Sequence, residues 1–185
     1  SALDLGCGRG EWLELLLKEG FSPLGIDRDA GMLRECLDRH LPAQRGDATA
    51  YLASVADDSQ AVVTAFHVVE HLPFDQLRAL VSEALRVLKP GGLLIMETPN
   101  PENILVATSN FYLDPTHKRP IPSQLLSFLT EYHGFVRSTS LRLQESKALL
   151  DNDSISLQNV LEGASPDYAV IAQKAASPEI NELFD

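Results

Sequence analysis

The feature that most constrains the fold is the stretch Ala2–Gly10, in which a short apolar run breaks into three glycines before a helical pattern begins. An apolar run that ends in this way predicts a strand that turns sharply into a helix. The glycines Gly6, Gly8 and Gly10 stand at alternate positions. Because glycine has no side chain and adopts backbone angles closed to other residues, we expect a ligand to lie against this loop.

The loop departs from the dinucleotide-binding fingerprint G-x-G-x-x-G, because Glu11 stands where the third glycine belongs. A carboxylate at that position repels a pyrophosphate. A nucleoside that has no phosphate and carries a cationic centre fits better between Asp4 and Glu11. S-adenosylmethionine is such a ligand, and we expect it to be the cofactor.

Four further segments follow the glycine loop in an order that supports this interpretation. They are Gly25–Asp27 and Gly46–Ala48, which end a second and a third strand, Phe66–Leu72, which follows a fourth, and Leu88–Ile95, which enters a fifth. Together with the glycine loop, these segments resemble the motifs of class I S-adenosylmethionine-dependent methyltransferases. The stretches Glu97–Asn103 and Asn110–Pro122 resemble more narrowly the bacterial methyltransferase domains linked to the synthesis of O-antigen and other surface polysaccharides.

Strand and helix patterns alternate along the chain, which predicts a doubly wound, Rossmann-like α/β fold with a mostly parallel sheet. The resemblance implies a seven-stranded sheet in which 135–143 and 168–173 close the sheet as an antiparallel pair. Residues 99–120 contain four prolines and no period, which predicts a long loop over the cofactor cleft. For residues 144–166, a short helix and an edge excursion stay open as alternatives.

Composition excludes several classes of function. With 185 residues and 44% hydrophobic content, we expect one domain over 1–176 and an acidic tail over 177–185. The resemblance implies that a helical segment preceding the first strand is missing. A net charge of -11 argues against a nucleic-acid partner.

Two cysteines, Cys7 and Cys36, provide neither a disulfide framework nor a spaced set of metal ligands. The sequence contains no apolar stretch long enough to span a membrane and no recognisable leader. We therefore expect a cytoplasmic protein that reaches the inner membrane only through partners, such as further domains or polysaccharide-assembly proteins.

Several residues are candidates for binding the cofactor in addition to the three glycines. Asp27 ends the second strand, where a carboxylate can accept hydrogen bonds from both ribose hydroxyls. The resemblance implies that Asp47, with Ala48, contacts the adenine, although a helix cap or turn is the alternative for Asp47. Asp4 is expected to order the glycine loop or to meet the methionine end. His67 follows the fourth strand and is expected to contact the methionine part through its ring or its backbone.

The loop after the fifth strand concentrates groups that bind sugars or phosphates, namely Tyr112, Asp114, His117, Lys118 and Arg119. An imidazole can remove a hydroxyl proton near neutral pH, so His117 is the first catalytic candidate and His67 the second. The two cations suit an anionic acceptor, and a merely solvated loop is the alternative interpretation.

The adjacent residues Glu70 and His71 either contact the acceptor or brace the loop through a hydrogen bond. With His67 they could form a metal site. Because no second carboxylate cluster stands at ligand spacing in the sequence, we expect no metal.

The expected function is that of an S-adenosylmethionine-dependent O-methyltransferase acting on a saccharide hydroxyl or a sugar-linked phosphate in surface-polysaccharide biosynthesis. One alternative acceptor is a quinone-like or other small metabolite, because Glu70-His71-Leu72 also occurs in methyltransferases of that type. An alternative of another class is a domain that binds S-adenosylmethionine without catalysis.

Overall fold

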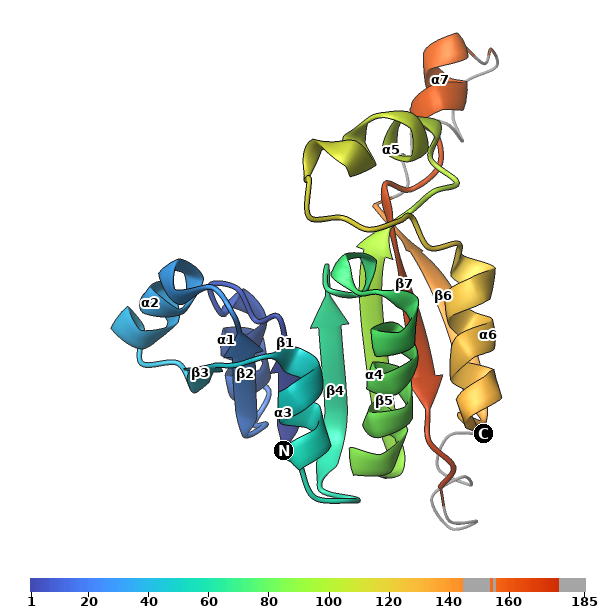
Figure 1. The fold of residues 1–185 in the computed structure, drawn as a ribbon. Helices are drawn as coiled ribbons and strands as arrows, with labels where there is room; N and C mark the ends of the chain where they lie inside the picture. The colour runs from blue at the N-terminus through green and yellow to red at the C-terminus, as the bar shows by residue number, and fades with distance from the viewer. Residues whose placement is uncertain (145–153, 155, 177–185) are drawn as a thin grey trace.

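A mixed sheet of seven strands forms the centre of the protein, as seen in a computed structural model that describes residues 1–144, 154 and 156–176 (Figure 1). The strand order is β3-β2-β1-β4-β5-β7-β6. The strands are β1 (Ala2–Leu5), β2 (Pro23–Asp27), β3 (Ala43–Arg45), β4 (Gln60–Phe66), β5 (Leu88–Pro99), β6 (Arg137–Leu143) and β7 (Asp167–Gln173).

The pairing confirms the predicted doubly wound topology. Strands β3, β2, β1, β4 and β5 are parallel to one another, whereas β7 lies antiparallel between β5 and β6. From β1 the chain first builds outward through β2 and β3, and then returns to add β4 on the other side of β1. Ligands of open α/β sheets bind beyond the carboxyl ends of the strands at such a reversal.

The helices connect the strands and cover the sheet. The longer ones are α1 (Glu11–Lys18), α2 (Ala30–Asp38), α3 (Ala48–Ser54), α4 (Phe74–Val87) and α6 (Ser123–His133), and the shorter ones are α5 (Ile104–Thr108), α7 (Leu157–Glu162) and the 3-10 turns η1 (Val69–His71) and η2 (Asn110–Leu113). As expected, Asp29 caps α2, because its side chain accepts hydrogen bonds from the amides of Gly31 and Met32. No helix within the described residues has the length and apolarity needed to cross a membrane.

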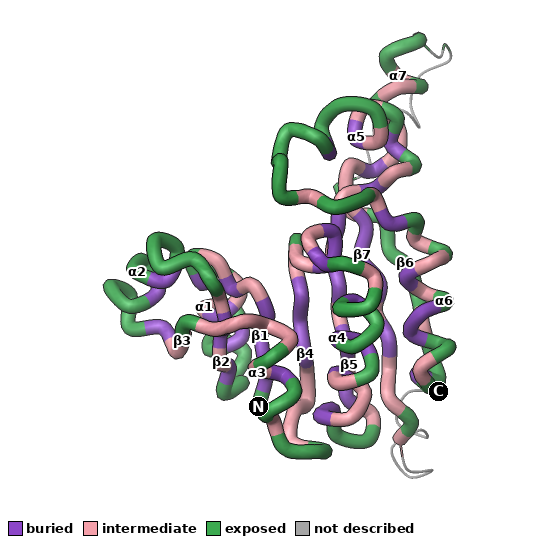
Figure 2. Tube along the Cα trace, viewed as in Figure 1, coloured by how far each residue is buried: buried purple, intermediate pink, exposed green. Residues whose placement is uncertain are grey.

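The core is divided into two clusters. The larger one packs the central strands against α4 and α6, and the smaller one joins Cys7, Leu13, Leu33, Cys36 and Leu41 between α1, α2 and the glycine loop. Figure 2 shows the central strands as mostly buried, whereas the chain beyond their carboxyl ends is largely exposed. Because Cys7 belongs to the glycine loop, the smaller cluster anchors this loop to α1 and α2.

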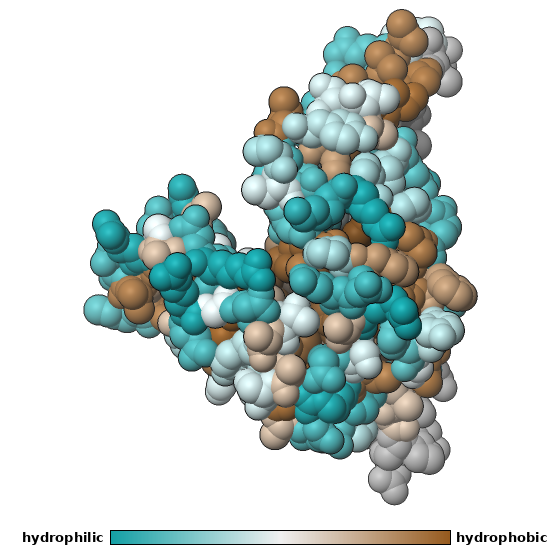
Figure 3. All heavy atoms as spheres, in the orientation of Figure 1, coloured by the Kyte–Doolittle hydropathy of each residue, from teal (hydrophilic) through white to brown (hydrophobic). Residues whose placement is uncertain are grey.

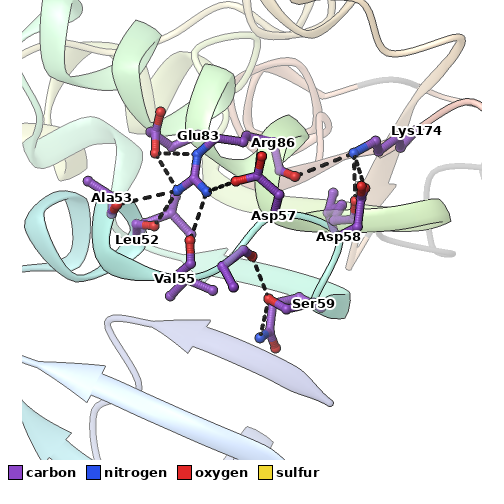
Figure 4. Close-up of polar contacts among 12 residues, drawn as sticks. Leu52, Ala53, Val55, Asp57, Asp58, Ser59, Glu83, Arg86 and Lys174 are labelled. Carbon is purple, nitrogen blue, oxygen red and sulfur yellow. Dashed lines mark hydrogen bonds and ion pairs between the residues drawn. The ribbon is translucent and has the colours of Figure 1, made fainter.

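On the side away from the carboxyl ends of the strands, Arg86 of α4 joins α4 to the end of α3 (Figure 4). Its guanidinium donates to the carbonyl oxygens of Leu52 and Val55 at 3.1 and 2.8 Å, and it also pairs with Asp57 and Glu83. The last carbonyls of a helix lack partners in a following turn. The carbonyl of Leu52 accepts from the amide of Val55, and Arg86 adds a second donor there and a donor to the carbonyl of Val55, just past α3.

Residues 99–120 differ from the sequence-based expectation, and within 144–166 the short helix, one of the two alternatives, is observed. The predicted long loop 99–120 contains α5 and η2, which are too short to produce a recognisable hydrophobic period. The side chain of Asn103 begins α5 by accepting a hydrogen bond from the amide of Val106. Within 144–166 the helix α7 is present, while 145–153, 155 and the predicted tail 177–185 lie outside the described residues.

Candidate functional site

The three glycines of the loop after β1 all have left-handed backbone angles, with φ of 76°, 54° and 86° for Gly6, Gly8 and Gly10. A Cβ on Gly6 would lie 2.3 Å from Val68, and one on Gly10 would lie 2.5 Å from Leu41. A Cβ on Gly8, by contrast, would meet no described residue within 4 Å apart from its own chain neighbours. Gly6 and Gly8 line the main cleft, so Gly8 provides an open approach to the backbone.

Asp27 holds the glycine loop to the end of β2. Its carboxylate accepts hydrogen bonds from the amides of Gly8 and Asp29, at 2.9 and 2.8 Å. Each carboxylate oxygen can accept a further hydrogen bond, and Asp27 also lines the cleft. The same side chain can therefore order the loop and accept hydrogen bonds from a ligand.

Asp47 and Ala48 also line the cleft, at the start of α3. Asp47 caps this helix by accepting a hydrogen bond from the amide of Ala50 at 2.7 Å, and its other oxygen pairs with Arg28. Asp47 is thus a helix cap, which was the alternative interpretation of this residue, and it also lies on the cleft wall.

Asp4 lies outside the cleft, beneath the glycine loop. Its side chain accepts a hydrogen bond of 2.6 Å from the hydroxyl of Thr64 on β4, and the residue is only 2% exposed. Burial raises the pKa of Asp4 to about 7, although the bond from Thr64 opposes this shift. Asp4 and Gly10 therefore support the loop rather than line the cleft.

His67 follows β4 with a left-handed backbone, φ 52°, and lines the cleft with a half-exposed side chain. Its two ring nitrogens lie 3.3 Å from Glu70 Oε1 and 3.4 Å from Glu97 Oε1. The hydrogen bond to Glu70, and to a smaller extent the one to Glu97, raise the pKa of His67 to about 10. The ring is therefore protonated at neutral pH and has no lone pair with which to accept a proton.

Glu70, His71 and His117 form a second group behind His67. One ligand atom from each lies within 4.8 Å of the others, and the rings of His71 and His117 are 4.7 Å apart. Glu70 is fully buried and accepts a hydrogen bond from the hydroxyl of Thr98 at 2.9 Å. Spacing in the sequence does not reveal this group, because the fold brings His117 to η1 from a distant part of the chain, and the expectation that no metal is bound stays a prediction.

The loop that carries η2 forms one wall of the cleft. Of the predicted acceptor residues, His71 and Lys118 line the cleft together with Thr116. Tyr112 is 64% exposed, and the guanidinium of Arg119 lies 4.5 Å from the ring centroid of Phe74. Asp114 accepts hydrogen bonds from Thr116, while Glu70 and His117 lie behind the cleft-lining residues.

The resulting cleft has a volume of about 770 Å³ and opens beyond the carboxyl ends of β1, β2, β3 and β4. Figure 3 shows the surface hollowed between the side formed by α2 and the loop that carries α5. The further lining residues come from the strand ends, α2, α3 and α4, and are Ile26, Arg28, Asp29, Met32, Gly46, Thr49, Val68, Leu72, Pro73 and Gln76.

Three polar residues of this region were not predicted as functional. The hydroxyl of Thr116 lies 2.8 Å from His71 Nδ1, Glu97 contacts His67, and Asp167 belongs with Glu97 and His67 to a second cluster of close ligand atoms. Glu97 is the first residue of the stretch Glu97–Asn103, which stood out in the sequence. Asp167 begins β7, and only the antiparallel insertion of that strand beside β5 brings it to the site.

Comparisons with known proteins agree with this geometry. Residues 3–96 match a family of methyltransferase domains. A probable S-adenosylmethionine-dependent methyltransferase of Mycolicibacterium smegmatis is 30% identical over 152 residues, which cover 82% of this chain and 58% of that protein. The crystal structure of a SAM-dependent methyltransferase from Archaeoglobus fulgidus superposes with a TM-score of 0.82 at 33% identity, covering 94% of this chain and 85% of that one.

A ubiquinone biosynthesis O-methyltransferase of Methylococcus capsulatus is 34% identical over 104 residues, which cover 54% of this chain and 43% of that protein. The chain thus spans 58% of the length of the relative from Mycolicibacterium smegmatis and less of the relative from Methylococcus capsulatus.

Proposed function

This chain belongs to the family of S-adenosylmethionine-dependent methyltransferases, and on that premise we propose that it transfers a methyl group from S-adenosylmethionine to a saccharide. The acceptor atom is a hydroxyl or a sugar-linked phosphate oxygen, in the biosynthesis of a surface polysaccharide. The observation that carries the choice of acceptor is the polar wall of the cleft, to which His71, Thr116 and Lys118 contribute.

The cofactor occupies the part of the cleft nearest the glycine loop. Asp27 accepts hydrogen bonds from the ribose hydroxyls, and Asp47 and Ala48 border the adenine. His67 borders the methionine part through its backbone, because both nitrogens of its ring already face carboxylates. When bound, the cofactor would supply the methyl group, and His71 and Thr116 on the cleft wall would border the acceptor.

The acceptor binds against that wall. A sugar hydroxyl must lose its proton to become a good nucleophile, and the neighbouring pair His71 and His117 provides the imidazoles for this step. A phosphate is already anionic and requires only a cation, for which Lys118 is the residue on the cleft wall. Methyl transfer itself is an in-line displacement, so most of the catalytic effect comes from alignment.

A quinone-like acceptor is the second candidate, because a ubiquinone biosynthesis O-methyltransferase is among the similar proteins. An aromatic hydroxyl acceptor would be expected to pack against apolar side chains. Leu72 and Pro73 are the apolar lining residues nearest to His71 in sequence. The polar residues His71, Thr116 and Lys118 of the cleft wall favour the saccharide.

Formation of S-adenosylhomocysteine tests the proposal directly. The purified chain is incubated with S-adenosylmethionine and, in parallel, with a glycan that ends in a free hydroxyl, the same glycan ending in phosphate, and a short-chain quinol. We expect turnover with one of the glycans. Turnover with the quinol alone would select the second candidate, and cofactor binding without turnover on any acceptor would contradict the saccharide proposal.

The variants Lys118→Ala and Arg119→Ala separate the two predicted cations. If the acceptor is a phosphate, Lys118→Ala should raise the Michaelis constant for it by about tenfold or more, because a charge-assisted hydrogen bond contributes roughly 1.5–3 kcal/mol. Arg119→Ala should have a smaller effect, since Arg119 lies over Phe74. A larger effect of Arg119→Ala would assign the phosphate to that residue instead.

A further inference from the structure

The hydrogen bonds around His117 fix the form of its ring. Its Nδ1 lies 2.6 Å from the backbone carbonyl oxygen of Phe111, which can only accept a hydrogen bond. Nδ1 therefore carries a proton. In the neutral ring the lone pair then belongs to Nε2, which points toward Glu70 Oε1 and Asp114 Oδ2 at 4.0 Å each.

The ring of His71 is fixed in the same way. Its Nδ1 lies 2.8 Å from the hydroxyl oxygen of Thr116, and this hydroxyl is in turn 2.7 Å from Asp114 Oδ1. Because the carboxylate can only accept, the proton of Thr116 is directed to Asp114, and Thr116 accepts from His71. In the neutral ring of His71 the lone pair then belongs to Nε2, as in His117.

One ligand atom from each of Glu70, His71 and His117 thus lies within 4.8 Å of the others, and Glu70 Oε1 also accepts a hydrogen bond of 3.3 Å from His67 Nδ1. The separation of 4.0 Å between His117 Nε2 and Glu70 Oε1 is too long for a direct hydrogen bond. A histidine that donates one N–H to a carbonyl or another protein acceptor, and presents the other nitrogen to a shared centre, has the arrangement of a metal ligand. Glu70 is fixed as well, since Thr98 holds its second oxygen.

We propose that Glu70, His71 and His117 bind one divalent transition-metal ion at the acceptor end of the cleft. Bonds of about 2.0–2.2 Å to a common ion require ligand atoms about 3–3.5 Å apart, so the 4.0 Å separation of His117 Nε2 and Glu70 Oε1 needs to shorten by about half an ångström to one ångström, and the other separations, which lie within 4.8 Å, by at most about 1.8 Å. Two imidazoles and one carboxylate select Zn²⁺ or a related transition metal over Mg²⁺ and Ca²⁺, which prefer oxygen ligands.

The position of the cluster gives the ion a role in the reaction, and this part of the inference rests on the proposed function. His71 and Thr116 line the cleft, so the open coordination positions of the ion face the acceptor. Both imidazoles then act as ligands and no longer as bases; an acceptor hydroxyl bound to the ion would instead lose its proton to water more readily. Its oxygen then forms the new bond to the methyl carbon as the carbon–sulfur bond breaks and its electron pair passes to sulfur.

The neighbouring cluster of His67, Glu97 and Asp167 does not have these properties. Both nitrogens of His67 already face carboxylates at 3.3 and 3.4 Å, and the ring is half exposed. This cluster is an ion-pair network. It provides an internal comparison for the test, because it has the same kinds of residue within the same region.

Direct metal titration tests the inference. The chain is freed of metal with a chelator and titrated with Co²⁺, whose visible absorption reports nitrogen ligands, and with Zn²⁺ by calorimetry. We expect one ion per chain. His71→Ala and His117→Ala should each weaken metal binding at least about tenfold. Removing a residue that only orients a metal ligand already weakens binding by about 10- to 100-fold, and removing a ligand should cost at least as much.

His133→Ala, a change at the end of α6 outside the cleft, should leave the affinity unchanged, and His67→Asn should change it little. Binding of S-adenosylhomocysteine verifies that each variant is folded. Absence of saturable binding to the unaltered chain, undiminished binding in both His71→Ala and His117→Ala, or loss in His67→Asn alone would each overturn the proposal. Because metal binding is measured without an acceptor, its outcome does not depend on the saccharide assay. The metal site could be confirmed even if no saccharide were methylated.

Discussion

At the scale of single residues, the site separates side chains that face the cleft from those that hold them in place. Asp27 and His67 belong to the first group, and Asp4 and His117 to the second. The distinction depends on burial and on hydrogen-bond partners. Asp4 illustrates it, because its position two residues before the first glycine of the loop suggests ligand contact, whereas its carboxylate is buried and accepts a hydrogen bond from Thr64 of β4.

Asp4 should make the stability of the protein depend on pH. Because its pKa is raised from 3.8 to about 7 in the folded chain, folding disfavours the charged form. Stability associated with this group is therefore fully present below about pH 4 and is lost as the pH rises through about 7. Asp4→Asn keeps the size of the side chain and an oxygen for Thr64, and it removes the charge.

Denaturant unfolding of both proteins measures the effect. At about pH 5 the two free energies of unfolding should lie closer together than at about pH 8, where Asp4→Asn should be the more stable by up to a few kcal/mol, at about 1.4 kcal/mol per pKa unit. Other titrating groups cancel in the comparison. A difference that does not change with pH would show that Asp4 is not the buried acid described above.

At the scale of elements, the strands and the glycine turn could be predicted from local pattern, and the acceptor wall could not. The turn at Gly6–Gly10 follows from glycine spacing, and Asp29 is recognisable as a cap from its position before α2. The contact between His71 and His117 depends on how the segment with α5 and η2 folds back over η1. No period in the sequence encodes that return, which is fixed by single bonds such as the one from the amide of Lys118 to the carbonyl of Glu70.

The junction between α3 and α4 provides a test of element packing. Arg86→Met keeps most of the length of the side chain but removes the side-chain donor to the carbonyl of Val55 and the second donor to the carbonyl of Leu52, which still accepts from the amide of Val55. We expect the free energy of unfolding to fall by about 1–3 kcal/mol, which is the usual effect of losing hydrogen bonds to a charged group.

The matched control is Arg78→Met, an exposed change on the same helix. Its free energy of unfolding should remain within about 0.5 kcal/mol of that of the unaltered protein. Both are measured by urea denaturation. Equal effects of the two substitutions would mean that the contacts in Figure 4 contribute nothing specific.

At the scale of the whole molecule, the cleft exists because the strand order reverses at β1. The residues on its walls come from the ends of four parallel strands and from one loop after β5, so no contiguous segment contains the site. The cofactor side follows the strand ends and was largely predictable from the motifs. The acceptor side depends on tertiary folding, which explains why Thr116, Glu97 and Asp167 escaped the sequence analysis.

The central claim is that this cleft binds S-adenosylmethionine with Asp27 at the ribose, and calorimetric titration with S-adenosylhomocysteine tests it most directly. The unaltered chain should bind one equivalent. Asp27→Ala should bind at least several-fold more weakly, since the lost hydrogen bonds correspond to roughly 1–3 kcal/mol, whereas Asp38→Ala on the exposed end of α2 should bind normally. Unchanged affinity in a folded Asp27→Ala protein would contradict the assignment of the cleft.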